Sequence, residues 1–267
     1  MSKITAIQLG SMTPAFPVAY NSYAKGLNLI SCNRGKALTL AGGGHGLYLL
    51  PLFDKVTSID NSRPQIAINE FYRAFIAKYD FVAWKKLFSE EPTAKKKESL
   101  FSDLSPLVSS QCRGIEFKEI INQIDFHNYS NPFFSTKETY NRVKDSIIRG
   151  NWEILLGEIP SALKIILKDA KFDFMNFLDL FVPGYTKLEG RKRILATAAK
   201  HLNKNGEILV EMAGLLMVPV VVRNELHVED KCPSALITPG SLRLKAKLEM
   251  DVGDSPQAMK IYMFEKN

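Results

Sequence analysis

KALTLAGGGHGLYLLPLFDKVTSIDNSRPQ, residues 36–65, decides the fold that we predict for this chain. Its apolar run 37–40 predicts a short strand, and this strand stops at the consecutive glycines 42–44. Because they have no Cβ atom, glycines let the backbone turn tightly and approach a ligand closely. The stretch therefore predicts a strand and a glycine turn at which a ligand can lie against the backbone.

The residues after the turn predict a helix over 47–53 and a second strand over 55–59, which ends at Asp60. Asp60 lies 18 positions after Gly42, close to the spacing of about 20 at which a strand-end carboxylate binds ribose hydroxyls. We therefore predict a nucleoside site. The alternative is that the glycines serve packing alone. For His45, inside the turn, we expect only a solvated or helix-capping role.

Composition favours one compact protein. At 267 residues and 46% hydrophobic content, the chain can bury one sizeable core, and we expect a single domain, 1–267. The three cysteines are scattered and the histidines do not cluster, so we expect neither disulfides nor a metal site. The N-terminus lacks a basic start with a long apolar core, and no apolar run is long enough to span a bilayer. These features predict a cytoplasmic protein.

The net charge of +7 and the pI near 9.2 would favour contact with phosphates, a nucleic acid or an anionic membrane. The basic residues are widely spread, however, and the dense run 95–97 lies beside Glu90, Glu91 and Glu98. This mixture is typical of a solvated helical face. We therefore do not expect a nucleic acid as the main partner, and peripheral membrane contact stays open.

Two segments are expected to surround the sheet. Residues 1–35 are rich in turn formers and aromatics and predict a lid over its mouth, on which Tyr20 and Tyr23 are candidates to line a substrate cleft. The alternative is that this pair packs one helix face. Residues 63–88 carry apolar residues at a helical period, and the charged residues 89–149 predict a helical insertion. Such additions around a rigid sheet often bind the substrate.

Two later strands deliver acids to the same edge of the sheet. Residues 152–156 predict a strand followed by Glu158, and residues 172–178 predict a strand followed by Asp179. In open α/β sheets, ligands bind at the carboxyl ends of the strands. We therefore expect Glu158 and Asp179 on the same rim as Asp60.

The rest of the chain predicts a helix and a β-rich end. A helix is expected over 188–202 and a strand over 207–212, after the turn-forming Asn205 and Gly206. The terminal β-rich pieces are 216–222, 242–250 and 260–264. Such an end suits an antiparallel hairpin that closes the sheet.

Five segments resemble, in order, the motifs of class I S-adenosylmethionine-dependent transferases: LTLAGGGHG, VTSIDNS, ILLGEI, FDFMNFLD and HLNKNGEILVEM. The resemblance implies an α/β fold with a Rossmann-like seven-stranded methyltransferase sheet, an N-terminal lid, a helical insertion and S-adenosylmethionine as cofactor. One alternative, an NAD-dependent oxidoreductase, would need a second mononucleotide-binding half, which the sequence lacks. Another, a non-catalytic binding module, is opposed by the intact glycines and Asp60.

The segment DNSRPQIAINEFYRAFIAKYDFVAWKKLF, residues 60–88, is similar to a narrower group. These enzymes transfer the 3-amino-3-carboxypropyl group of S-adenosylmethionine to diacylglycerol, the first committed step to betaine lipids. The matching residues are Asp60, Pro64, Gln65, Tyr79, Phe81 and Phe88. This likeness implies aminocarboxypropyl transfer to a lipid or small-molecule acceptor. Methyl transfer is the alternative, because all three carbons on a sulfonium are electrophilic and orientation selects among them.

The resemblance also implies a set of cofactor-binding residues: Ala41, Gly42, Gly43, Gly44, Gly46, Asp60, Asn61, Gln65, Glu158, Ile159 and Asp179. In this set the glycine turn approaches the methionine, Asp60 holds the ribose, and Glu158 or Ile159 borders the adenine. Asp179 is a candidate to attract the methionine ammonium or to act as a base, with helix capping as the alternative. Asp179, Tyr20 and Tyr23 are thus the candidate catalytic residues. The acceptor and the oligomeric state stay open.

Overall fold

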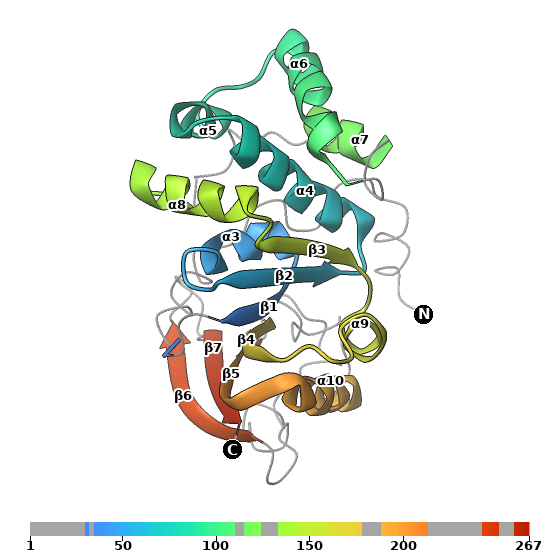
Figure 1. The fold of residues 1–267 in the computed structure, drawn as a ribbon, viewed down its shortest axis with the longest axis vertical. Helices are drawn as coiled ribbons and strands as arrows, with labels where there is room; N and C mark the ends of the chain where they lie inside the picture. The colour runs from blue at the N-terminus through green and yellow to red at the C-terminus, as the bar shows by residue number, and fades with distance from the viewer. Residues whose placement is uncertain are drawn as a thin grey trace. The chain divides into compact units, whose positions relative to one another are not determined.

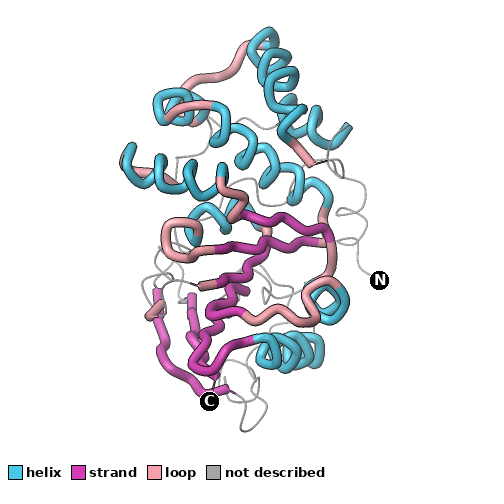
Figure 2. The backbone as a smooth tube through the Cα atoms, viewed as in Figure 1, coloured by secondary structure: helices cyan, strands magenta, loops and turns pink. Residues whose placement is uncertain are grey.

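The computed structural model describes residues 30–31, 35–109, 115–123, 133–177, 188–212, 242–250 and 259–266, and its fold is mixed α/β (Figures 1 and 2). The described residues form two compact units. The first holds the residues between Ala41 and Gly157, and the second holds those before Ala41 and after Gly157.

The first unit is built on two parallel strands, β2 (Lys55–Asp60) and β3 (Trp152–Leu156). Residues 56–59 of β2 are all buried, as expected for a parallel strand that is covered on both faces. The long helix α4 (Arg63–Lys78) follows β2 and contacts both strands (Figure 1). Asp60 therefore stands at the carboxyl end of β2, immediately before α4.

The glycine turn is a short 3-10 turn, η1 (Gly42–Gly44), and α3 (His45–Leu49) follows it directly. The helix predicted over 47–53 was therefore placed too late and made too long. Leu50 still has helical backbone angles, with φ −56° and ψ −34°, and Pro51 then ends α3 because proline has no N–H to continue the helical hydrogen bonds.

The single helical stretch predicted over 63–88 is two helices, α4 and α5 (Phe81–Leu87). Tyr79 ends α4 in an extended conformation, with φ −98° and ψ 171°. The Asp80 carboxylate then accepts a hydrogen bond of 2.9 Å from the backbone N–H of Ala83 and caps α5. A side-chain cap thus starts a new helix where the apolar period alone predicts continuation.

The described part of the predicted insertion is helical. Its elements are α6 (Ala94–Leu104), the 3-10 turn η2 (Ser105–Leu107), α7 (Ile115–Gln123) and α8 (Lys137–Ile148). Trp84 of α5 is fully buried, and its ring lies 5.1 to 6.0 Å, centroid to centroid, from those of Tyr72, Phe88, Phe133 and Phe134. Aromatic packing of this kind joins α4, α5 and the residues before α8 into one core.

The second unit holds a mixed sheet whose strands are, in spatial order, β1 (Lys36–Leu40), β4 (Phe172–Phe177), β5 (Leu202–Met212), β7 (Met259–Lys266) and β6 (Leu242–Met250). The first three run parallel, and β7 and β6 are each antiparallel to the preceding neighbour. The predicted strands over 242–250 and 260–264 thus form the expected antiparallel pair, whereas 216–222 lies outside the described residues.

Two helices of the second unit, α9 (Ile159–Ile165) and α10 (Leu188–His201), contact each other. The strand after α10 begins at Leu202, earlier than the predicted residue 207. The register is irregular there: Phe172 pairs with Leu202 and Phe174 with Glu207, so residues 203–206 of β5 have no partner in β4, and Asn205 has the left-handed φ of 61°. In the part of the chain that the structure describes, no helix is long and apolar enough to cross a membrane.

Candidate nucleoside site

The glycine turn has a backbone that favours glycine at two positions. Gly43 has φ 53° and Gly44 has φ 84°, so both lie in the left-handed region that side chains rarely adopt. A Cβ atom built on Gly44 would lie 3.1 Å from the rings of Phe133 and Tyr72. The turn is therefore packed tightly against the aromatic core on one side, which leaves no room for a larger residue.

Gly46 has a different requirement. A Cβ atom there would lie 2.5 Å from Trp152 Nε1 and 2.8 Å from Ser58 Oγ. These two atoms form a buried hydrogen bond of 2.9 Å that joins β3 to β2. Gly46 is thus needed for the close packing of α3 on the strands, which is a recognised function of a third glycine in such turns.

Asn69 of α4 hydrogen-bonds to Ala41, the residue that precedes the glycine turn. Its Nδ2 group donates to the backbone carbonyl of Ala41 and, at 2.8 Å, to that of Gln65. The N–H of Ala41 in turn donates to the carbonyl of Ile59 at 3.0 Å. Asn69 is fully buried, so this side chain fixes the residue before the glycines. Sequence reasoning missed it, although a polar residue on the apolar face of α4 was a visible signal.

Asp60 is half-buried, and backbone N–H groups of neighbouring residues donate hydrogen bonds to it. Its Oδ1 atom accepts a hydrogen bond of 2.9 Å from the backbone N–H of Ser62, and its backbone carbonyl accepts one of 2.7 Å from Gly157. Burial raises the pKa of the Asp60 carboxyl to about 6, while the Ser62 N–H and the nearby His45 lower it. The prediction that Asp60 ends the second strand is confirmed.

His45 is the first residue of α3 and is almost fully buried. We expected a solvated or capping histidine, whereas the ring is buried and packs on the glycine turn, since a Cβ atom built on Gly42 would lie 3.2 Å from its Cε1 atom. Its charge lowers the pKa of the Asp60 carboxyl. The imidazole therefore belongs to the same site as the acid. Only the folded chain reveals this, because the two residues are 15 positions apart in the sequence.

The remaining predicted residues of the first unit have unequal exposure. Asn61, directly after the acid, is exposed, whereas the side chain of Gln65 is only 2% exposed in the first turn of α4. Gln65 is therefore part of the packed base of the site. Asn61 is open to solvent.

The second unit carries Glu158 and Ile159. Glu158 is exposed and occupies the N-cap position of α9 without a side-chain capping hydrogen bond, and Ile159 is buried in the first turn. Asp179, Tyr20 and Tyr23 lie outside the described residues, so their expected roles stay predictions. The described residues contain no group of three or more His, Cys, Asp or Glu side chains that could hold a metal ion.

The structure also shows a buried polar pair that the sequence did not suggest. Asn176 of β4 donates from Nδ2 to Thr39 Oγ1 of β1 at 2.9 Å, and both side chains are fully buried. The pair lies one residue before the end of each strand. It fixes the register of these two parallel strands at their carboxyl ends.

No protein-family model matches the sequence, and a search of curated proteins finds no match. Among solved structures, the chain is similar to the N-methyltransferase NodS from Bradyrhizobium japonicum WM9 in complex with S-adenosyl-L-homocysteine, with 10% identity, a TM-score of 0.48, and 99% of this chain and 97% of that chain covered. It is also similar to an rRNA methylase from Streptococcus thermophilus, with 9% identity, a TM-score of 0.43, and 92% and 93% covered. These values are too low to assign a family.

Proposed function

We propose that the chain is an S-adenosylmethionine-dependent transferase and that it transfers the methyl group. One observation carries this proposal: a left-handed glycine turn and a desolvated strand-end carboxylate, Asp60, belong to the same compact unit. This is the arrangement by which α/β proteins bind a nucleoside. The five motifs in sequence order add independent support.

The residues of this site suit the nucleoside. Gly43 and Gly44 carry no side chains of their own, so a ligand can approach their backbone closely on the side away from Phe133 and Tyr72. Of the Asp60 oxygens, Oδ1 already accepts from Ser62, and a carboxylate has enough lone pairs to accept two ribose hydroxyls as well. With a pKa of about 6, Asp60 is mostly ionised at neutral pH, as hydroxyl binding requires.

The bound sulfonium would supply an electrophilic carbon, and the residues of the chain decide which carbon meets the acceptor. We favour the methyl carbon because it is the least hindered of the three. Aminocarboxypropyl transfer is the second candidate, since residues 60–88 resemble enzymes with that activity. The acceptor in either case is proposed to be a small molecule or a lipid, and Asp179 is the proposed base or ammonium partner.

We also propose that the fold is of the Rossmann-like seven-stranded methyltransferase type, as the order of the five motifs implies. The antiparallel end formed by β7 and β6 supports this, because it resembles the closing hairpin that the motif order implies. In this arrangement Glu158 and Ile159 would border the adenine.

Titration calorimetry with S-adenosylhomocysteine and with NAD tests the ligand. We expect S-adenosylhomocysteine to bind and Asp60→Ala to weaken binding by about 1 to 3 kcal/mol, through the loss of buried hydrogen bonds. Asp54→Ala is the matched control, because Asp54 is an exposed acid just before β2. Binding of NAD alone, or equal affinity in Asp60→Ala, would contradict the proposal.

The transferred group is identified by mass spectrometry after incubation with S-adenosylmethionine and a cell extract. S-adenosylhomocysteine as the product means methyl transfer. Methylthioadenosine means that the aminocarboxypropyl carbon was attacked, and the second candidate then replaces the first.

A further inference from the structure

The end of helix α9 presents two consecutive isoleucines to solvent. Ile165 is 74% exposed and Ile166 is 55% exposed, whereas Ile159, Ala162 and Leu163 of the same helix are buried. The helix therefore packs on the core through its other apolar residues, and this pair takes no part in that packing. Paired large aliphatic side chains at such exposure are candidates for an interaction surface.

Lysines lie on both sides of the two isoleucines in the sequence. Lys164 and Lys168 flank them in the sequence, and both are exposed. Lys171 reaches α10, because its Nζ atom donates to the backbone carbonyl of Lys200 at 2.6 Å. The only acid within residues 164–171 is Asp169, which is 88% exposed and 4.0 Å from the Lys168 ammonium.

The cationic surface continues onto the end of β7. Lys266 donates to the carbonyl of Leu202 at 2.7 Å, and burial lowers its pKa, with a further lowering from the nearby Lys171 ammonium. We call Lys164, Ile165, Ile166, Lys168, Lys171, Lys200 and Lys266 the α9 patch. It comprises two exposed isoleucines and five lysines from α9, the segment between α9 and β4, α10 and β7.

We propose that the α9 patch binds the surface of a bilayer that contains anionic lipids. Lysines near such a surface are attracted to its negative charge, and aliphatic side chains gain by entering the boundary between headgroups and acyl chains. A nucleic acid would bind the lysines but would offer the isoleucines only a phosphate backbone. This inference does not rest on the proposed transferase activity.

Vesicle co-sedimentation of the full chain tests it. Vesicles of phosphatidylcholine are compared with vesicles that contain about one third phosphatidylserine. We expect the full chain to bind the anionic vesicles at least about tenfold more tightly, and to lose most of this preference as salt rises to about 0.5 M. Equal binding to both vesicles, or no binding to either, would overturn the proposal.

Two variants locate the surface. Ile165→Ser/Ile166→Ser should reduce binding to anionic vesicles by about tenfold or more, and Lys164→Glu/Lys168→Glu should abolish the preference for phosphatidylserine. The matched control is Ile148→Ser, because Ile148 is 64% exposed but belongs to α8 of the first unit. Thermal unfolding checks that each variant folds, as expected for substitutions at exposed positions.

The isoleucine variant also separates a membrane from a nucleic acid. If it binds anionic vesicles as tightly as the unaltered chain, the patch is not the membrane site. If a single-stranded RNA binds the unaltered chain and the isoleucine variant equally and displaces both from vesicles, the surface is an electrostatic nucleic-acid site, and the proposal is overturned.

Discussion

At the scale of single residues, Asp60 has to meet two opposing requirements. Its carboxylate must be ionised to accept hydroxyl groups, yet burial raises its pKa from 3.8 to about 6. The folded chain therefore binds a proton at Asp60 more tightly than the unfolded chain does. Ionisation of this group costs stability above about pH 6, and the cost disappears as the pH falls toward the unfolded value.

Asp60→Asn should consequently make the free protein more stable while it weakens nucleoside binding. The pKa shift corresponds to an increase in the free energy of unfolding of about 1 to 3 kcal/mol at about pH 8, and the difference should close as the pH approaches about 4. Urea unfolding at the two pH values measures this. A variant that is less stable at about pH 8 would show that Asp60 forms stabilising contacts that outweigh its desolvation.

His45 and Asn69 are two buried residues of the site whose roles depend on distant parts of the sequence. The charge of His45 lowers the pKa of Asp60, the Asn69 side chain fixes the backbone of Ala41, and both side chains are buried. A residue pattern read along the chain gives a histidine in a turn no particular role, and it treats an asparagine in a helix as a poor helix former. Their roles follow from neighbours that lie 15 and 28 positions away in the sequence.

At the scale of elements, the packing of α3 on β2 and β3 depends on the absence of one Cβ atom. Gly46→Ala should force the Trp152 indole away from Ser58 and cost about 1 to 3 kcal/mol, because the nearest atoms lie 2.5 and 2.8 Å from the new carbon. Chemical denaturation measures the loss. In a Trp152→Phe background the same substitution should cost less, since the indole nitrogen that would clash is gone.

An equal cost in both backgrounds would mean that the strain arises elsewhere in the helix. Gly46 matters here because a glycine in this motif can be required either by the backbone conformation or by the packing of side chains against it. Gly43 and Gly44 are required by the backbone conformation, whereas Gly46 is required by side chains from two strands. Two different physical requirements therefore explain why these three positions of the motif are glycines.

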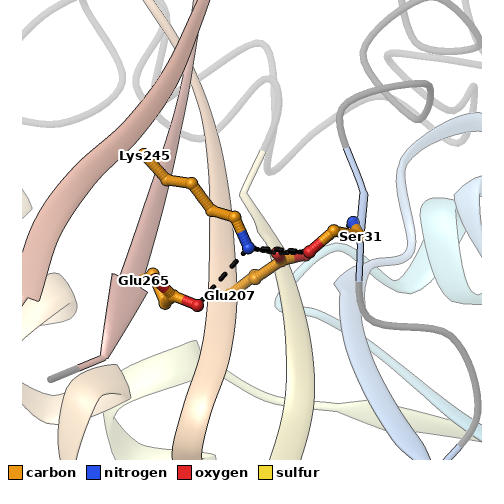
Figure 3. Close-up of polar contacts among 4 residues, drawn as sticks. All are labelled: Ser31, Glu207, Lys245 and Glu265. Atoms are coloured by element: carbon orange, nitrogen blue, oxygen red, sulfur yellow. Dashed lines mark hydrogen bonds and ion pairs between the residues drawn. The ribbon is translucent and has the colours of Figure 1, made fainter.

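At the scale of the whole chain, a charge cluster around the buried Glu207 links distant segments of the second unit (Figure 3). Lys245 of β6 bonds to Glu207 of β5, whose side chain is fully buried, and lies 3.4 Å from Glu265 of β7. Ser31 donates from its backbone N–H and its hydroxyl to Glu207, at 3.1 and 2.6 Å. The cluster therefore joins residue 31 to three strands near the other end of the chain.

Lys245→Met should destabilise the protein by about 3 to 5 kcal/mol, because it leaves a buried carboxylate without its cation. The hydrogen bond with Glu207 is the main reason that the pKa of Lys245 is raised. Its stabilising effect should therefore be complete below the unfolded value of 10.5 and disappear as the pH rises through the higher folded value. Urea unfolding of both proteins measures the difference.

Lys245→Met combined with Glu207→Gln is the matched control. This double variant should recover part of the lost stability, since the buried group is then neutral. A loss below about 1 kcal/mol in Lys245→Met would show that the cluster is effectively a surface ion pair.

Much of the fold was predictable because its signals are local. The strand over 37–40, the glycine turn and the strand that ends at Asp60 follow from apolar runs, glycines and spacing within 30 residues. The strands over 152–156 and 242–250 were predicted with the bounds that the structure shows. The break at Tyr79 and the early start of β5 were missed, because a side-chain cap and an irregular register can outweigh periodicity.

By itself, the sequence determined the order of the elements and the position of Asp60 at the end of β2. Only the tertiary structure decided that His45 lies near this acid, that Asn69 holds the turn, and that the α9 isoleucines stay outside the core. The physical reason is distance along the chain. Secondary structure depends on neighbouring residues, whereas burial, hydrogen-bond partners and pKa depend on residues that only folding brings together.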